Sequence, residues 1–320
     1  MQKALVTGCN GFVGRALVAR LVADGFEVWG IDRTTAYEGL PANYYFAGDL
    51  RDAAFVARAI DAAPVDCIVH LAAQSSVRRS FDEPATTLTD GMLPALHILE
   101  HLRARESKAR VLLVGSADEY GVVAADNIPI AETQPARPAS PYALAKSIQN
   151  QAGVMYSSLY GADTVMTRSF NHTGPGQRDD FVLANFARQV AGIKHGRHEP
   201  VIEVGDLEVR RDFLDVRDVC DAYLLLLQKG RSGETYNVCS GKSYRIRDLL
   251  DRLCELAGVE VKLHVDTGRL RPVDMPELRG DPSKIREHTG WRANIDIEET
   301  LSAMLEDWEQ KLPAASKDTK

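Results

Sequence analysis

Three glycines at intervals of three follow a short apolar run near the start of the chain. Gly8, Gly11 and Gly14 come directly after residues 3–7 and open residues 12–23, whose apolar positions have helical spacing. Glycine permits a tight turn and lets backbone N–H groups approach a pyrophosphate, which then lies at the positive end of the helix. A glycine triple also occurs in purely structural turns, but the strand–turn–helix context favours a dinucleotide-binding fold.

Apolar, β-rich runs recur through the first half of the chain and alternate with segments of helical spacing. Strands are expected at residues 3–7, 27–32, 44–47, 67–71, 111–114 and 164–168. This alternation predicts an α/β fold built on a Rossmann-type, doubly wound parallel sheet. A long helix is expected around residues 88–102, and Pro94 inside it should kink or interrupt it.

The alternation loosens beyond residue 171, which suggests a second and smaller unit. Helices are expected at residues 181–194, 216–227, 246–257 and 297–311. We therefore expect a dinucleotide-binding Rossmann domain and a smaller, mixed α/β substrate-binding domain. The first would span residues 1–170 plus about 212–241, and the second about 171–211 plus 242–316.

Composition excludes several classes of protein. The net charge of −7 argues against a general nucleic-acid or anionic-membrane binder, which would present a basic field. The five cysteines show no C-x-x-C spacing, so we expect buried thiols in a reducing compartment and no bound metal. No apolar run approaches the ~20 residues that a transmembrane helix needs, and the N-terminus does not read as a signal peptide. The expected location is the cytoplasm.

The end of the second predicted strand bears on the choice of cofactor. An acid such as Asp32 can accept hydrogen bonds from the adenosine ribose hydroxyls, which favours NAD(H). Arg33 beside it can instead meet the 2′-phosphate of NADP(H). The sequence leaves both NAD(H) and NADP(H) open.

Tyr142 and Lys146 lie one turn apart on a helix that is expected to begin at Pro141, with Ser140 as its N-cap. A nearby ammonium is expected to lower the pKa of the phenol, which makes it a usable proton donor or acceptor near neutral pH. Taken alone, a Tyr-x-x-x-Lys spacing more often joins an amphipathic tyrosine to a solvated lysine. Whether Tyr142 and Lys146 form a catalytic pair must therefore be judged from the rest of the sequence.

Four motifs occur in a characteristic order: Gly8-x-x-Gly11-x-x-Gly14, Asp49-Leu50, His70-Leu71-Ala72-Ala73 and Tyr142-x-x-x-Lys146. In this order and spacing they resemble the extended short-chain dehydrogenase/reductase family, and the likeness covers nearly the whole chain. The resemblance implies a catalytic Tyr–Lys pair. It also implies the cofactor-binding residues Gly8, Asn10, Gly11, Phe12, Val13, Gly14, Asp32, Arg33, Asp49, Leu50, Leu71, Ala72, Ala73, Tyr142 and Lys146. His70 is expected to be a packed strand residue.

The run after the fifth predicted strand supplies further catalytic candidates. Ser116 matches the family's serine, which helps to hold the reacting carbonyl. Asp118 stands where related sugar-nucleotide 4,6-dehydratases have a glutamate that acts as base on the sugar C5. The side chain is one methylene shorter, which argues against a full dehydratase and suits a reductase. Glu119 is expected to be solvated. The implied catalytic set is Ser116, Asp118, Tyr142 and Lys146.

One position departs from the family pattern. The family usually has an asparagine in the long helix before the fifth strand, where it supports the lysine through water. Here Gly91 occupies about that place, beside Asp90. Either Asp90 or a different group should therefore support Lys146.

Several positions resemble the substrate side of the family's nucleotide-sugar enzymes. Arg211 and Arg271 stand in family-like contexts, and a nucleoside diphosphate needs such cations for charge-assisted hydrogen bonds. Asp274 could accept hydrogen bonds from ribose or base donors. The implied substrate-binding set is Gln74, Ser116, Asn171, Val182, Arg188, Arg211, Arg271 and Asp274.

Three segments, residues 170–177, 204–206 and 211–216, narrow the resemblance to one nucleotide-sugar branch. That branch reduces the C4 ketone of GDP-4-dehydro-6-deoxy-D-mannose with NAD(P)H, which implies a GDP-sugar substrate and Tyr142 as proton donor. The alternatives are a GDP-mannose 4,6-dehydratase, another nucleotide-sugar epimerase or dehydratase, or a non-catalytic dinucleotide sensor. The family also implies a homodimer through the helix near residues 88–102 and the Tyr–Lys helix.

Overall fold

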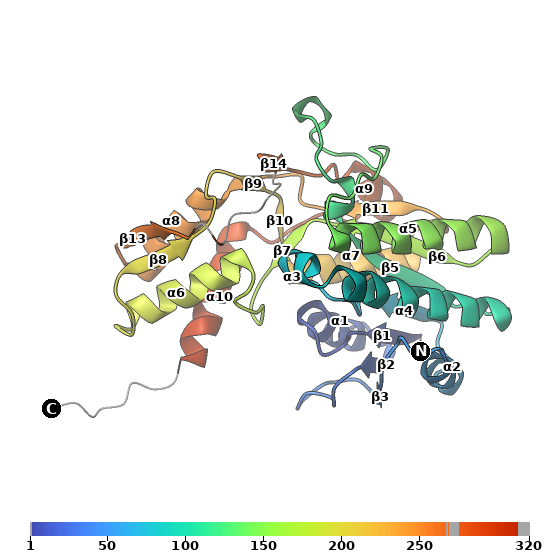
Figure 1. Cartoon of the computed structure of the whole chain (residues 1–320). Coiled ribbons are helices and arrows are strands. Elements are labelled where there is room, and N and C mark those ends of the chain that lie inside the picture. The colour runs from blue at the N-terminus through green and yellow to red at the C-terminus, as the bar shows by residue number, and fades with distance from the viewer. Residues whose placement is uncertain (1, 267, 269–274, 313–320) are drawn as a thin grey trace.

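A seven-stranded parallel sheet forms the centre of the computed structural model, which describes residues 2–266, 268 and 275–312 (Figure 1). The strand order is β11-β6-β5-β4-β1-β2-β3, and every neighbouring pair is parallel. The strands are β1 (Lys3–Thr7), β2 (Glu27–Asp32), β3 (Tyr44–Ala47), β4 (Cys67–His70), β5 (Arg110–Ser116), β6 (Thr164–Ser169) and β11 (Thr235–Val238). The predicted Rossmann-type sheet is confirmed.

Helices cover both faces of this sheet, as the alternation of side chains along its strands requires. Ala4 and Val6 of β1 belong to one apolar cluster, and Leu5 between them belongs to the other. The first face is covered by α1 (Phe12–Ala23), α7 (Val216–Lys229) and α9 (Ser283–Thr289). The second face is covered by α2 (Ala53–Ala62), α4 (Pro84–Ala104) and α5 (Pro141–Tyr160).

A third apolar cluster lies outside the sheet and joins a smaller group of elements, on the left in Figure 1. Its helices are α6 (Val182–Lys194), α8 (Ile246–Ala257) and α10 (Ile297–Lys311), and its strands are β8 (Val201–Val204) and β13 (Lys262–Val265). Two small sheets join β7 (Asn171–Thr173) to β10 (Phe213–Asp215), and β9 (Arg210–Arg211) to β12 (Tyr244–Arg245) and β14 (Glu277–Leu278). The domain boundaries expected from the sequence remain a prediction.

Short helices complete the fold: α3 (Val77–Asp82), η1 (Ala117–Tyr120) and η2 (Ala125–Asn127). Among the described residues, no helix has the length and apolar character needed to span a bilayer. All five cysteines are buried and free.

Helix α4 continues through Pro94, so of the expected kink or interruption at this proline, the interruption does not occur. Proline removes one N–H and crowds the preceding turn, but tertiary packing can outweigh that local cost. Pro94 is itself buried, and α4 packs along α5. The closest approach is at Gly91, where an added Cβ would lie 2.7 Å from the Cβ of Ala145.

We expect Gly91→Val to destabilise the protein by about 1–3 kcal/mol, because overpacking a tight helix contact forces the backbones apart. Denaturant unfolding followed by circular dichroism measures this free energy. Thr86→Ala, on the exposed part of the same helix, is the control and should change it by less than about 0.5 kcal/mol. Equal stability of Gly91→Val and the parent chain would contradict the close α4–α5 contact.

Candidate active site

A cleft of about 1450 Å³ opens between the carboxyl ends of the sheet strands and the α6 region. In an open parallel sheet, ligands bind at these ends where the strand order reverses. The reversal here lies between β1 and β4. The cleft is lined by all the predicted cofactor residues: Gly8, Asn10, Gly11, Phe12, Val13, Gly14, Asp32, Arg33, Asp49, Leu50, Leu71, Ala72, Ala73, Tyr142 and Lys146.

Two glycines of the turn between β1 and α1 have no room for a side chain. Gly8 has a φ of +73°, and an added Cβ would lie 2.9 Å from the backbone nitrogen of Ala72. At Gly14 an added Cβ would lie 2.7 Å from the Cα of Cys9. Helix α1 begins after Gly11 with no side-chain cap, so its positive end can receive a pyrophosphate. The turn therefore fits the dinucleotide that the sequence predicts.

Two arginines flank the acids at the adenosine end of the cleft. Arg51 lies 2.6 Å from Asp49 and 3.2 Å from Asp90, and Arg33 lies 3.8 Å from Asp90. The sequence reasoning missed Arg51, although it directly follows the Asp49-Leu50 motif. Asp90 is thus engaged by two arginines, which leaves the support of Lys146 to another group.

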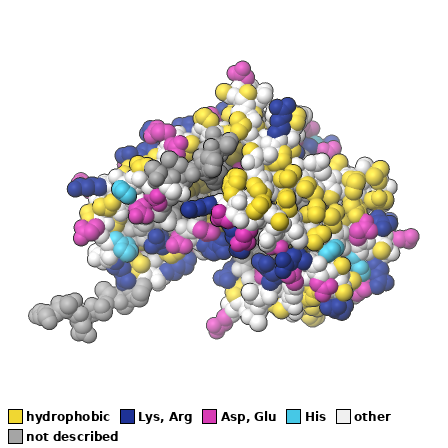
Figure 2. All heavy atoms as spheres, viewed as in Figure 1, with side chains coloured by type: hydrophobic (Ala, Val, Ile, Leu, Met, Phe, Trp, Pro, Cys, Tyr) yellow, Lys and Arg dark blue, Asp and Glu magenta, His cyan; other side chains and the backbone are white. Residues whose placement is uncertain are grey.

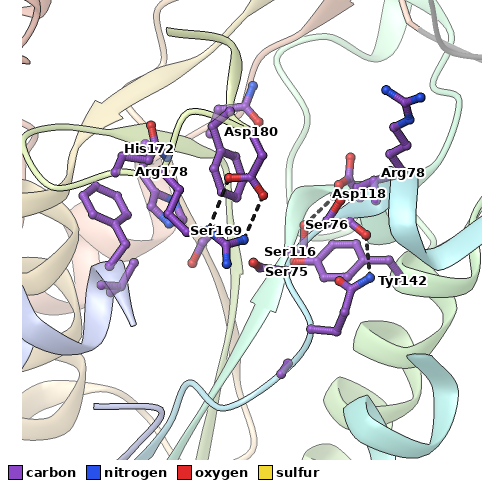
Figure 3. Close-up of a pocket in the computed structure, with 18 of the residues that line it drawn as sticks. Ser75, Ser76, Arg78, Ser116, Asp118, Tyr142, Ser169, His172, Arg178 and Asp180 are labelled. Carbon is purple, nitrogen blue, oxygen red and sulfur yellow. Dashed lines mark hydrogen bonds and ion pairs between the residues drawn. The ribbon is translucent and has the colours of Figure 1, made fainter. Parts of the chain in front are cut away.

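Three of the predicted catalytic residues, Ser116, Asp118 and Tyr142, meet on one side of the cleft (Figure 3), and Lys146 also lines it. Ser116 ends β5, and its hydroxyl accepts the N–H of Asp118 at 3.2 Å. Tyr142 lies in the first turn of α5, which Ser140 caps by accepting the N–H of Ala143 at 3.1 Å. Lys146 follows one turn later and is buried.

The pKa values differ from the sequence expectation. Burial raises the pKa of Tyr142 well above its usual range, the charge of Asp118 raises it further, and a hydrogen bond with Ser116 opposes the rise. The expectation that Lys146 lowers this pKa is wrong, since Lys146 is not among the influences on it. The lysine ammonium donates to the Val114 carbonyl at 2.7 Å. Burial lowers the pKa of Lys146 to about 8, against the opposing charge of Glu119. The phenol therefore stays protonated near neutral pH and is poised as a donor.

Glu119 is fully buried, so the expectation that it is solvated is wrong. The short helix η1 turns its side chain back toward β5, where Oε1 accepts the Ser116 N–H at 2.9 Å. Oε2 lies 3.3 Å from Nε of Arg168. Burial raises the pKa of Glu119 to about 7, and Arg168 is the largest opposing influence.

His70 is fully buried in β4, as expected for a packed strand residue. Its Nδ1 lies 2.8 Å from the hydroxyl of Thr7. Burial lowers its pKa to about 3, so the ring is neutral.

The predicted substrate residues divide into three groups. Those that line the cleft are Gln74, Ser116, Asn171, Val182 and Arg211. Arg188 is absent from the described lining and forms an ion pair with Asp179 at 3.0 Å. Arg271 and Asp274 lie outside the described residues.

Besides Arg51, three arginines that the sequence reasoning did not select line the cleft: Arg15, Arg78 and Arg178. Figure 3 shows Arg78 and Arg178. Arg178 lies 2.8 Å from Asp180. It directly follows the 170–177 segment, so its position in the sequence could have suggested a role. Arg78 comes from α3, whose sequence carries no comparable signal.

Comparison with known proteins gives one matching family. Residues 5–304 match the family described as GDP-mannose 4,6 dehydratase. The chain is 38% identical to the GDP-6-deoxy-D-mannose reductase of Pseudomonas aeruginosa, over 97% of this chain and 98% of that protein.

Many solved structures share the fold, and two of them bear on the cofactor. The structure of RMD from Pseudomonas aeruginosa complexed with NADPH has a TM-score of 0.86 and 37% identity, covering 98% of this chain and 100% of that one. The UDP-glucose 4-epimerase of Thermus thermophilus, in complex with NAD, has a TM-score of 0.87 and 28% identity, covering 97% and 100%. Both neighbours therefore hold a nicotinamide dinucleotide.

The adenosine end allows a test of cofactor choice. Arg51 lines the cleft and shares Asp90 with Arg33, so we expect it also to meet the 2′-phosphate of NADPH. Arg51→Ala should then weaken NADPH binding about tenfold, because a charge-assisted hydrogen bond to that phosphate contributes about 1.5 kcal/mol. NADH lacks this phosphate, so its affinity should change less than about threefold. Titration of the reduced cofactor's fluorescence measures both constants.

Arg105→Ala is the matched control for this experiment. Arg105 pairs with Asp61 at 2.6 Å on the surface, outside the cleft lining. Its replacement should leave both affinities unchanged. An equal loss of NADH and NADPH affinity in Arg51→Ala would contradict a role in recognising the 2′-phosphate.

Proposed function

The chain belongs to the GDP-mannose 4,6-dehydratase family, within the short-chain dehydrogenase/reductases, and from this we propose that it is a nucleotide-sugar 4-keto reductase. The proposed reaction is the NAD(P)H-dependent reduction of GDP-4-dehydro-6-deoxy-D-mannose to GDP-6-deoxy-D-mannose. Its full-length likeness to a GDP-6-deoxy-D-mannose reductase supports this substrate.

One observation carries the proposal: Ser116 and Tyr142 share one side of the cleft that begins at the glycine turn. When bound, the cofactor supplies a hydride to the sugar C4. The Ser116 hydroxyl donates to the ketone oxygen, and the Tyr142 phenol gives it a proton as negative charge develops there. Lys146 is available to orient the cofactor ribose.

Asp118 distinguishes the reductase from a dehydratase. Its carboxylate interacts electrostatically with Tyr142, so it lies near the reacting atoms. The shorter side chain holds the carboxylate farther from the sugar C5 than a glutamate would, and proton transfer is sensitive to displacements of about 1 Å. We assign Asp118 to a hydrogen bond with a sugar hydroxyl.

The remaining site residues follow from the same proposal. Gln74, Asn171, Val182 and Arg211 would contact the GDP-sugar from the cleft wall, and Arg188, Arg271 and Asp274 keep the roles that the family resemblance implies. Five buried, free thiols support a reducing location, which we propose is the cytoplasm.

The reductase should consume reduced cofactor in a one-to-one ratio with the 4-keto sugar, which absorbance at the nicotinamide band measures. Tyr142→Phe should lower kcat by about 10²–10⁴-fold, because it removes the proton donor. Cofactor affinity should change little, since the ring remains. Tyr160→Phe, on the exposed end of the same helix, is the control and should keep full activity.

Two results would contradict this proposed function. One is turnover of GDP-mannose with no added reduced cofactor, which is the behaviour of a dehydratase. The other is full activity of Tyr142→Phe, which would remove Tyr142 from the chemistry.

We also propose a homodimer that pairs α5 and its neighbours. Six large apolar side chains are exposed on α3 and α5, and Figure 2 shows hydrophobic side chains gathered over this region. They are Phe81, Leu144, Val154, Met155, Leu159 and Tyr160. A contiguous exposed apolar patch of this kind is typical of a protein–protein interface.

Light scattering coupled to size exclusion should show a dimer at micromolar concentration. The double variant Met155→Glu with Leu159→Glu should run as a monomer, because it introduces charges that the interface must desolvate. Val265→Glu is the control, since Val265 is exposed on β13 in the other part of the molecule. A monomeric parent chain, or a double variant that stays dimeric, would contradict this interface.

A further inference from the structure

The carboxylate of Glu119 is buried next to Ser116 and takes no part in the proposed hydride and proton transfers. The residue has no exposed surface, and both of its oxygens have partners. Burying a carboxylate is costly unless it is paired and hydrogen-bonded. A carboxylate buried at this cost is expected to hold neighbouring groups in place.

Three consecutive residues at the end of β5 are each held by a side chain. The Val114 carbonyl accepts from Lys146 at 2.7 Å and from Gln149 at 3.0 Å. The Gly115 N–H donates to the Thr167 hydroxyl at 3.3 Å. The Ser116 N–H donates to Glu119 at 2.9 Å. Glu119 thus fixes the residue whose hydroxyl faces the cleft.

Gly115 makes this contact possible. An added Cβ there would collide with Oε1 of Glu119 and with the Thr167 carbonyl. Only a residue without a side chain lets the carboxylate lie so close to the strand. The position of Glu119 therefore depends on the glycine at position 115.

Glu119 also interacts with two cations. Arg168 pairs with it from β6 and stacks on Tyr120, with its guanidinium carbon 4.5 Å from the ring centroid. From α5, Lys146 interacts with it electrostatically. The other titratable groups around this pair are Asp118 on η1, Tyr142 on α5 and His70 on β4. Of the carboxylates among them, only Glu119 counts among the influences that keep Lys146 protonated.

The usual partner of the lysine is missing. Gly91 has no side chain to offer, and Asp90 is engaged by Arg33 and Arg51. A buried ammonium without charge compensation loses its proton more readily. Some group must offset this burial if Lys146 is to act as a cation.

We propose that Glu119 is a positioning residue for the reaction: its buried carboxylate fixes Ser116 through the backbone N–H and balances the charge of Lys146. This inference rests on the proposed reductase function for its activity readout. It assigns to Glu119 the support that the family pattern would place in α4.

The assignment predicts a pH dependence with two limbs. Burial raises the pKa of Glu119 to about 7, so its charge is present above that pH and is lost as the pH falls through it. Burial lowers the pKa of Lys146 to about 8, so its charge is present below that pH and is lost as the pH rises through it. The parent chain should therefore show a bell-shaped profile of kcat with its maximum between these values.

Glu119→Gln isolates the charge, because the amide oxygen can still accept the Ser116 N–H. The acid limb should disappear, and the alkaline limb should move about one unit lower, the usual effect of removing a nearby opposite charge. At pH 8 kcat should fall several-fold, while KM changes less than about twofold because substrate contacts remain.

Glu132→Gln is the matched control. Glu132 is partly buried and accepts the Asn237 N–H at 2.8 Å, but it lies outside the cleft lining. This variant should keep the parent profile. A uniform loss of rate at every pH in Glu119→Gln, with both limbs in place, would show a merely structural role and overturn the proposal.

A second measurement needs no substrate and is separate from the proposed function. In protein labelled with ¹³C at the lysine Cε, the Lys146 signal is identified by its loss in Lys146→Arg, and its pKa is followed by NMR titration. The pKa should drop by about one unit in Glu119→Gln and stay unchanged in Glu132→Gln. An unchanged Lys146 pKa would overturn the charge balance even if the parent chain proved to be no reductase.

The parent chain alone provides the test if Glu119→Gln fails to fold. Its kcat should decline below pH 7 in step with protonation of Glu119. A parent profile that is flat from pH 6 to pH 7.5 would overturn the proposal. Absence of any turnover with the 4-keto sugar, together with a normal NMR response, would instead refute only the proposed function.

Discussion

The hydrogen bond from the Lys146 ammonium to the Val114 carbonyl joins the two elements on which the site depends. It fixes the first turns of α5 against the end of β5, so Tyr142 and Ser116 reach the cleft from adjacent supports. The bond forms where the interior excludes water, which strengthens it and also makes the ammonium expensive to keep charged. The buried location that lets this hydrogen bond position α5 is therefore also what makes the Lys146 charge costly to keep.

The tight approach of α4 to α5 follows from the same constraint. A helix whose lysine reaches the end of β5 must lie close to its neighbours, and Gly91 allows this at Ala145. The absence of a side chain at this position brings the helices together but leaves no donor or acceptor for the lysine. The Lys146 charge has consequently to be balanced from the β5 side. There Gly115, which also lacks a side chain, lets the Glu119 carboxylate lie close to the strand.

Local patterns were sufficient to predict most of the fold. The glycine turn, the strand–helix alternation and the Tyr–Lys spacing each depend on residues that are near one another in the sequence, and the structure places all of them as expected. Glu119 was wrongly expected to be solvated, and Arg51 was missed, because their roles depend on partners that only the tertiary fold brings close, such as Arg168 and Asp90. The continuity of α4 through Pro94 depends on tertiary packing in the same way, since α4 packs along α5.

The elevated pKa of Tyr142 has a direct chemical meaning. A ketone reduction needs a proton at the moment the hydride arrives, so a phenol that keeps its proton before the reaction is correctly prepared. Burial and the Asp118 carboxylate both favour that protonated state. The same burial and charge oppose the phenolate that Tyr142 becomes once it has given up this proton. The electrostatics of the site therefore favour the return of a proton to Tyr142 after each reduction.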